Sequence, residues 1–413
     1  MQRIVLSLML RLKNSLFYVL ANVLVALSPG ASHLAFAGPG SARRLCRHIA
    51  AEGISRLLVV TDRPLRELGI VDEALRGFAD SGVELAFYDG VKPDPDFDQV
   101  AEGAVILREH DCEAVLAIGG GSSIDCAKVI AACARSSEDP RRWIGLGKVK
   151  HEVLPIFAIP TTAGTGSEAT MGAVISDPLS HEKGVITGRP LSVSATALDA
   201  SLQLGMPPAI TAATGMDALT HAIETWICRW NRGTARDDAR RAIRMIFEAL
   251  PRAYANGDDL DARETMATAA WYAGIAINQV NVGSVHAIAH QLGAKYGIPH
   301  GLANAMVLPH VLDYCAVEAE AGLAELADLI GAGAGMASSA QKARAFIDAV
   351  VALRDGVGIA ATTDRIRPED LDELVALSVK EAVAYFPPKL LTPDGARRIL
   401  TAISSADSSV PSG

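Results

Sequence analysis

Five side chains in the second half of the chain have the types and spacing of metal ligands. Asp217 and His221 are four residues apart, and His286 and His290 repeat this spacing, so each pair lies on one face of a helix. His300 follows shortly after them. One buried histidine alone is more often a core residue, but this cluster favours coordination. A carboxylate with three imidazoles suits Fe²⁺, Zn²⁺, Mn²⁺ or Co²⁺, and since such a site takes four ligands, one histidine has another task.

Two loops in the first half predict a site for a long anionic ligand such as a dinucleotide. The turn GGGS at residues 119–122 follows an apolar strand at 114–118 and opens a helix at 123–134. Glycines let the backbone approach a phosphate, and a helix N-terminus presents free N–H groups to it. The usual GxGxxG fingerprint is absent. A second loop, TTAGTGSE at 161–168, also follows a strand and supplies hydroxyls and glycines.

Asp62 ends another strand, at residues 57–61, and its carboxylate could accept hydrogen bonds from ribose hydroxyls. The same charge repels a 2′-phosphate, which favours NAD over NADP. The alternative role for Asp62 is that of a helix N-cap or turn residue.

The elements that must position these groups change in kind along the chain. Strands and helices alternate as far as residue 160, which predicts a parallel sheet covered on both faces, with ligands beyond the carboxyl ends of the strands. The strands are predicted at 33–41, 57–61, 83–88, 114–118 and 154–159, and helices at 71–81, 98–110 and 123–134. Beyond residue 205 only helices are predicted, at 208–230, 236–255, 263–278, 285–296, 303–316, 324–354 and 368–384. We therefore expect an α/β domain over 29–205 and a helical domain over 206–413.

Composition supports two domains and excludes some classes of protein. A chain of 413 residues is longer than one hydrophobic core usually serves. A net charge of -9 without a basic run argues against a nucleic-acid partner. The six cysteines are scattered, with no CxxC pair, which indicates reduced thiols in a cytosolic protein rather than a disulfide framework or a zinc ribbon.

Residues 1–28 predict an amphipathic helical extension, with three bases, no acid and one narrow polar stripe. Arg11, Lys13 and Asn14 interrupt the apolar run, which argues against a membrane span. We expect this helix to contact a membrane surface or a partner subunit. The alternatives are a helix packed on its own domain and a signal peptide, but cleavage after Ala37 would cut the strand predicted at 33–41.

Four motifs resemble the iron-containing (group III) alcohol dehydrogenase family. They are GGGSSIDCAK (119–128), IPTTAGTGSE (159–168), TAATGMDALTHAIE (211–224) and VHAIAHQLGAKYGIPHGLANAMVLPHV (285–311). The resemblance extends from about residue 33 to 314, and more weakly to near 400. It implies an N-terminal dinucleotide-binding α/β domain with a parallel sheet and an all-α C-terminal domain, the dehydroquinate synthase-like architecture, with the active site in the cleft between them.

The resemblance also implies residue roles. The metal ligands would be Asp217, His221, His286 and His300, and His290 would be a catalytic residue near the nicotinamide that relays a proton. The expected cofactor-binding residues are Asp62, Gly120, Gly121, Ser122, Ser123, Asp125, Thr161, Thr162, Thr165 and Lys183. Ser123 replaces a proline common in the family, and Asp94 stands where an asparagine is frequent.

The implied activity is hydride transfer between NAD(H) and a small primary or secondary alcohol or aldehyde. A divalent metal, Fe²⁺ or else Zn²⁺ or another ion, would polarise the substrate oxygen. We also expect a homo-oligomer in the cytoplasm. Its N-terminal helix could place it at the periphery of the membrane. The alternatives are a glycerol-type dehydrogenase or a maleylacetate-type reductase on the same scaffold and, from another class, a nucleotide-binding assembly protein without catalysis. The complete Asp/His set favours the iron type.

Overall fold

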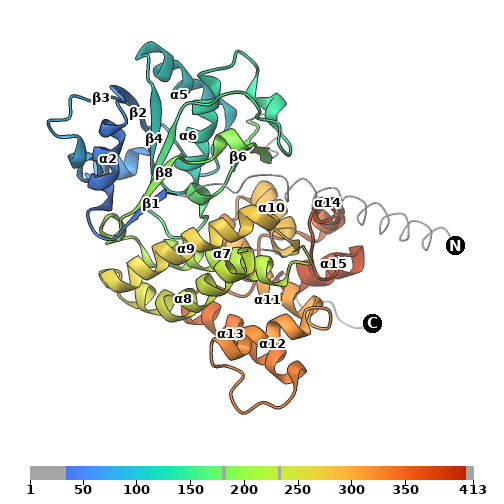
Figure 1. Ribbon diagram of the computed structural model, residues 1–413. Coiled ribbons are helices and arrows are strands. Elements are labelled where there is room, and N and C mark those ends of the chain that lie inside the picture. Colours follow the sequence, from blue (N-terminus) through green and yellow to red (C-terminus); the bar gives the residue numbers. More distant parts are fainter. Residues whose placement is uncertain (1–33, 179–182, 231–233, 406–413) are drawn as a thin grey trace. The chain divides into compact units, whose positions relative to one another are not determined.

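The computed structural model describes residues 34–178, 183–230 and 234–405. An α/β part precedes a helical part in the chain, and both belong to one compact unit that begins at Leu34 (Figure 1). The helix predicted for residues 1–28 lies outside the described residues. No helix among the described residues has the length and apolar content that crossing a membrane requires.

A six-stranded sheet forms the centre of the α/β part. Its order is β1-β8-β5-β4-β2-β3, and every neighbouring pair is parallel. The strands are β1 (Leu34–Ala37), β2 (Arg56–Val60), β3 (Glu84–Tyr88), β4 (Ala114–Gly119), β5 (Ile156–Pro160) and β8 (Ala195–Leu198). Because all strands run the same way, the loops that follow β2, β4 and β5 lie at one edge, which carries Asp62 and both predicted phosphate loops.

Helices cover both faces of this sheet, as predicted, and Figure 1 shows α2 on one side and α5 and α6 on the other. Alternate residues of one strand serve the two faces: Leu57 and Val59 join the core beneath α2 and α4, whereas Leu58 and Val60 join the core beneath α5 and α6. The helices of this part are α2 (Ser41–Ala51), α3 (Arg63–Glu67), α4 (Ile70–Leu75), α5 (Phe97–Glu109) and α6 (Gly121–Cys133). The near-continuous apolar strands follow from burial on both faces.

A small antiparallel hairpin, which was not predicted, lies between β5 and β8 in the chain but outside the six-stranded sheet. It consists of β6 (Gly172–Ser176) and β7 (Lys183–Thr187), which pair along their whole length. Ala173, Ile175 and Ile186 are buried in the same core as α6. The hairpin therefore continues the α/β part and carries Lys183 at the start of β7.

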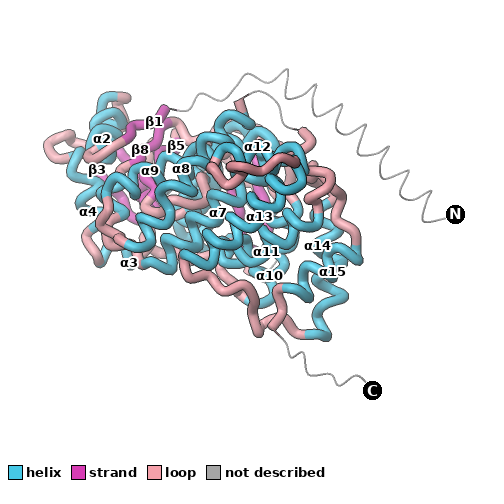
Figure 2. Tube along the Cα trace, turned by 90° about the horizontal axis from the view of Figure 1, so that it is seen from below, coloured by secondary structure: helices cyan, strands magenta, loops and turns pink. Residues whose placement is uncertain are grey.

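The remaining elements are helices packed around one large apolar core. They are α7 (Pro208–Ile227), α8 (Ala235–Ala255), α9 (Leu260–Val280), α10 (Ser284–Tyr296), α11 (His300–Tyr314), α12 (Glu320–Leu329), α13 (Ser339–Gly356), α14 (Leu371–Ala382) and α15 (Pro393–Ala402). Helix α7 packs against α8, α9 and α11, and Figure 2 shows these helices side by side. Among the described residues beyond 205 there is no β-strand, in agreement with the prediction.

Local side chains explain where several helices begin. Asp96, Asp259 and Thr392 each accept a hydrogen bond from a backbone N–H in the first turn of α5, α9 and α15. Ser338 and Gln341 form a capping box at the start of α13.

One helix prediction was wrong and several elements were missed. Residues 324–354 were expected to be helical throughout, but α12 ends at Leu329 and α13 begins at Ser339. Gly331 and Gly335 adopt left-handed backbone conformations in the intervening turn, where a continuing helix is not possible. Strand β8 and helices α2, α3 and α15 were not predicted, although α15 buries Ala396, Ile399 and Leu400 at helical spacing.

Candidate metal centre and cofactor site

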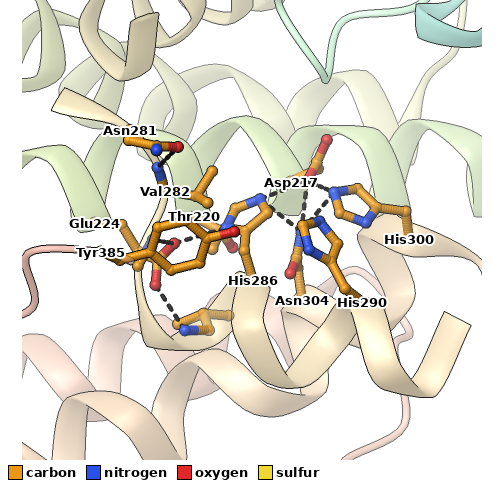
Figure 3. A network of polar contacts seen from close by, with 12 residues as sticks. Asp217, Thr220, Glu224, Asn281, Val282, His286, His290, His300, Asn304 and Tyr385 are labelled. Carbon is orange, nitrogen blue, oxygen red and sulfur yellow. Dashed lines mark hydrogen bonds and ion pairs between the residues drawn. The ribbon is translucent and has the colours of Figure 1, made fainter. Parts of the chain in front are cut away.

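Three helices bring four candidate ligands together. Helix α7 supplies Asp217 and His221, α10 supplies His286, and His300 is the first residue of α11. One ligand atom from each of these residues lies within 4.8 Å of the others. Figure 3 shows Asp217, His286 and His300 directed toward one another. His290 is not a member of this group of four, although its ring stacks on that of His300.

The four residues fit a divalent cation. Bonds of roughly 2.0–2.2 Å to one ion would require only a small contraction of the observed group. The Nε2 atoms of His300 and His286 lie 3.4 and 3.9 Å from Asp217 Oδ1. Within the described part of the chain, the Nδ1 atom of His221 is buried without a hydrogen-bond partner, as expected for a group that awaits a ligand. The donor set of one oxygen and three nitrogens suits iron or zinc.

Burial keeps two imidazoles of this cluster, those of His286 and His300, neutral and able to donate electron pairs. It lowers the pKa of His300 to about 3 and the pKa of His286 well below its ordinary value. Burial alone would raise the pKa of Asp217, but the three neighbouring imidazoles and Asn304 outweigh it and hold this pKa below its usual range. The cluster thus presents the Asp217 carboxylate beside neutral His286 and His300, the protonation states that bind metals.

Asn304 contacts three of the four candidate ligands. Its Nδ2 donates to Asp217 Oδ1 at 2.7 Å and lies 3.2 Å from the Nε2 atoms of both His286 and His300. It is fully buried, and its Oδ1 has no hydrogen-bond partner among the described residues. The amide therefore faces the electron pairs that a cation would use.

His290 is held beside the centre by the C-terminal region. Its Nδ1 donates to Glu381 Oε1 at 2.6 Å, and the hydroxyl of Tyr385 donates to the same oxygen at 2.7 Å. Gln291 Nε2 donates to the other oxygen of Glu381 at 2.6 Å. Figure 3 shows His290 beside Asn304 and His300. This network fixes the ring of His290 through its Nδ1 atom.

Three residues of the site, Glu224, Asn304 and Glu381, were not predicted. Glu224 lies three residues after His221, and its Oε2 accepts a hydrogen bond from His286 Nδ1 at 2.6 Å. Helical spacing could have revealed Glu224 and also Asn304, which lies one turn after His300. Glu381 is separated from His290 by 91 residues, so no local sequence pattern could predict this contact.

The glycine turn and the second loop meet at the predicted edge of the sheet. A Cβ placed on Gly120 would lie 3.2 Å from Thr162 Oγ1, and one on Gly121 would lie 2.7 Å from Thr165 Oγ1. Thr161 donates its N–H to Gly119 O at 3.0 Å, which ties the two loops together. Since Gly120, Gly121, Ser122, Thr162 and Thr165 are all partly exposed there, they can contact a ligand, whereas Thr161 is buried.

Ser123 and Asp125 face inward instead. Ser123 is buried, with its Oγ against Gly119. Asp125 accepts from Ser167 Oγ with one oxygen and from Val174 N–H at 2.8 Å with the other. The ammonium of Lys128, fully buried, donates to Ser167 O at 2.7 Å and to Gly172 O at 2.6 Å. This geometry suits a role in positioning the second loop, because a carboxylate on the pyrophosphate itself would repel it.

Asp62 and Lys183 both have partners within the chain. Asp62 Oδ1 accepts from Leu65 N–H at 2.9 Å, so Asp62 is the N-cap of α3, one of the two roles considered for it. Burial raises its pKa. Lys183 Nζ forms an ion pair with Asp94 Oδ1 at 2.5 Å and lies 3.5 Å from the position of a Cβ on Gly293 in α10. Lys183 thus reaches from the hairpin to a helix of the metal centre.

Close backbone contacts join the second loop to the helical part. A Cβ on Gly164 would lie 2.6 Å from Thr214 Cβ, one turn before Asp217 in α7. Gly166, with a φ of 62°, packs so closely on α9 that its Cβ would lie 2.6 Å from Gly274 Cα. The cofactor loop therefore rests on the helix that carries two candidate ligands.

Gly274→Ala tests this contact. In a helix interior the change would ordinarily stabilise by about 1 kcal/mol, but here the added methyl would collide with Gly166 O. Because backbone on both sides cannot yield cheaply, we expect a lower melting temperature and NADH binding weakened at least severalfold. Thermal unfolding and fluorescence titration with NADH measure both. A variant as stable as the parent with the same NADH affinity would show that the loop position does not matter.

A glycine-rich sheet edge that lies against a helical Asp/His cluster is the arrangement expected of a metal-dependent dehydrogenase. The comparisons with known proteins agree with this class. Residues 33–200 match the family model of iron-containing alcohol dehydrogenase, and residues 211–404 match the C-terminal model of the Fe-containing alcohol dehydrogenase family. The chain belongs to the iron-containing alcohol dehydrogenase family.

Individual relatives cover nearly the whole chain. The 1,3-propanediol dehydrogenase of Klebsiella pneumoniae is 37% identical over 362 residues, which are 87% of this chain and 91% of the relative. The NAD-dependent methanol dehydrogenase of Bacillus methanolicus is 33% identical over 86% of this chain and 94% of its own. A crystal structure of 1,3-propanediol oxidoreductase superposes with a TM-score of 0.86 at 35% identity, covering 89% of this chain and 97% of the other. The predictions of family and fold are thus confirmed.

Proposed function

We propose that this protein transfers hydride between NAD(H) and a small primary or secondary alcohol or aldehyde at a centre formed by Asp217, His221, His286 and His300. The observation that carries the proposal is the convergence of four ligand atoms within 4.8 Å on helices, one of which contacts the second cofactor loop. The relative from Bacillus methanolicus, NAD-dependent by its name, supports the choice of cofactor.

The α/β part binds and orients the cofactor in this proposal. Gly120, Gly121 and Ser122 cradle the pyrophosphate at the start of α6, and Thr162 and Thr165 contact it from the second loop. Thr161, Ser123 and Asp125 hold the two loops in register from behind. Lys183 lies between Asp94 and α10, on the path from the sheet edge to the centre. A cofactor held by these residues would extend toward the helical part that carries His290.

The helical part holds the ion and moves the proton. A bound Fe²⁺, or Zn²⁺ in its place, supplies a Lewis acid that lowers the pKa of an alcohol hydroxyl. His290 Nε2 accepts the hydroxyl proton during oxidation of the alcohol, while its Nδ1–H stays hydrogen-bonded to Glu381. The imidazolium that results can pass its Nδ1 proton to Glu381, which is partly exposed and so connects His290 to solvent. In the reduction of an aldehyde, a proton moves along the same path in the opposite direction, from solvent to the substrate oxygen.

Asp62 selects NAD(H) in this account, and Asp62→Asn tests it. The amide keeps an oxygen for the Leu65 N–H and preserves the N-cap, but it removes the charge that repels a 2′-phosphate. We expect the preference for NAD(H) over NADP(H), measured as the ratio of kcat/KM values, to fall by about tenfold. Asp62→Ala should do the same and also cost about 1 kcal/mol of stability through loss of the cap. An unchanged ratio in Asp62→Asn would remove Asp62 from cofactor selection.

The reaction itself is tested by following NADH absorbance with a series of alcohols and aldehydes, after loading the protein with Fe²⁺ or Zn²⁺ without oxygen. We expect turnover of small primary or secondary alcohols that chelation abolishes. Turnover confined to a polyol with Zn²⁺ would favour the glycerol-type alternative, and turnover confined to an unsaturated keto acid the maleylacetate type. NADH binding without any turnover would favour a non-catalytic assembly protein and contradict the proposal.

We also propose a cytosolic homo-oligomer. The six cysteines are all free in the structure, five of them buried, as in a reducing compartment. The predicted helix in residues 1–28 would contact a membrane surface or a partner subunit. Deletion of residues 1–28, followed by measurements of liposome pelleting and solution mass, decides between these two roles. If neither measurement changes, the remaining interpretation is a helix packed on its own domain.

A further inference from the structure

Glu224 is a buried carboxylate that serves three donors at once. It lies on α7 with only 5% of its surface exposed. Its Oε2 accepts from Gly283 N–H at 2.9 Å and from His286 Nδ1 at 2.6 Å, and its Oε1 accepts from Val285 N–H at 2.7 Å. Figure 3 shows Glu224 behind His286, on the side away from His300.

The bond to His286 decides which of its nitrogens faces the centre. An acceptor at Nδ1 holds the proton there, so Nε2 keeps its electron pair. Nε2 is the atom that lies 3.9 Å from Asp217 Oδ1, in the group of candidate ligands. A carboxylate in this position also fixes the plane of the ring and raises its basicity as a ligand.

The two backbone bonds decide where the ring stands. Gly283 is the N-cap of α10 and Val285 lies in its first turn, so Glu224 supplies from another helix the acceptor that an N-cap side chain usually gives. Negative charge at a helix N-terminus is also favourable. Because Asp217, His221 and Glu224 follow one another on the same face of α7, one carboxylate ties the ligands of α7 to the start of α10.

The approach of Glu224 to α10 requires a glycine. A Cβ on Gly283 would lie 2.6 Å from Glu224 Oε1 and 3.0 Å from its carboxyl carbon. The backbone φ of Gly283 is -131°, which any residue can adopt, so the requirement comes from the carboxylate alone. The position of the Glu224 carboxylate therefore depends on the absence of a side chain at residue 283.

We propose that Glu224 is a positioning residue that orients His286 toward the cation, and that Gly283 is a glycine in order to admit it. This inference rests on the proposed function, in which His286 is a ligand. Glu224 acts through His286 and touches neither substrate nor cofactor. Removal of the Glu224 carboxylate should weaken metal binding but leave cofactor binding by the α/β part unchanged.

The test measures Zn²⁺ affinity of the metal-free full-length protein by competition with a coloured chelator. Glu224→Gln keeps the shape but places an amide NH₂ against one of three donors, and Gly283→Ala pushes an intact carboxylate away. We expect each to weaken Zn²⁺ binding about 10–100-fold, as the loss of a hydrogen-bond partner of a ligand does elsewhere. NADH affinity should stay within twofold, and Glu248→Gln, an exposed glutamate on α8, should match the parent.

The readouts separate the possible failures. Thermal unfolding of the metal-free variants detects a merely structural role: a lower melting temperature with parental Zn²⁺ affinity would overturn the inference. Glu224→Asp, which keeps the charge, should recover part of the affinity lost in Glu224→Gln. His286→Ala in the same titration tests the ligand itself. If it binds Zn²⁺ like the parent, the proposed metal centre fails, and the failure is not one of Glu224 alone.

Discussion

Replacing His286 or His300 with alanine should remove both the bound metal and nearly all turnover. Each histidine supplies one of the four grouped ligand atoms, His286 from a buried position and His300 from a partly exposed one. Lewis-acid catalysis is worth several kcal/mol, and every 1.36 kcal/mol is tenfold in rate. We therefore expect kcat/KM to fall at least about a thousandfold, with metal content near zero by elemental analysis.

A histidine of the same helix provides the matched control. His310 lies on α11 like His300, is partly buried, and is not among the four grouped residues. His310→Ala should keep the metal and most of the activity. Full activity in a metal-free His286→Ala protein would refute the assigned centre, and equal losses in His310→Ala would mean that α11 had simply been disturbed.

Replacing His290 should separate catalysis from metal binding. His290 lies beside the centre, its ring stacked on His300, with Nδ1 engaged by Glu381. As a general base or acid its contribution is about 10²–10⁴-fold. His290→Ala should therefore lower kcat by about 10²–10⁴-fold. Its metal content and NADH affinity should remain close to those of the parent.

The comparison with His286→Ala makes the result decisive. Exogenous imidazole should restore part of the activity of His290→Ala, since the lost side chain leaves room beside the centre, but should do nothing for His286→Ala. Loss of metal in His290→Ala would make this residue a ligand. Parental kcat would show that the proton leaves by another route.

The architecture was largely predictable from local patterns. Strands buried on both faces appear as short apolar runs, such as residues 57–60 and 114–118, and burial of alternate residues in two cores explains why. The pairs Asp217 with His221 and His286 with His290 were visible because helical spacing places them on one face. The hairpin β6–β7 was missed because its strands are short and only half-buried.

The partners of the site residues were harder to predict, because they come from distant segments. Glu381 reaches His290 from α14, and Ser167 and Val174 occupy the oxygens of Asp125. Only tertiary packing brings these groups together, so a motif names a residue without showing which way it faces. Asp125 illustrates this: it was predicted at the pyrophosphate, and its hydrogen bonds instead suit a supporting role.

Anomalous diffraction from crystals grown without oxygen, recorded at the iron and zinc absorption edges, tests the metal centre most directly. Our account predicts one peak in the helical part, within roughly 2.0–2.3 Å of a carboxylate oxygen of Asp217 and of one nitrogen each of His221, His286 and His300. Its distance to both nitrogens of His290 should exceed bonding range. A peak bonded to other residues, or one that includes His290 in place of any of the four, would contradict the account.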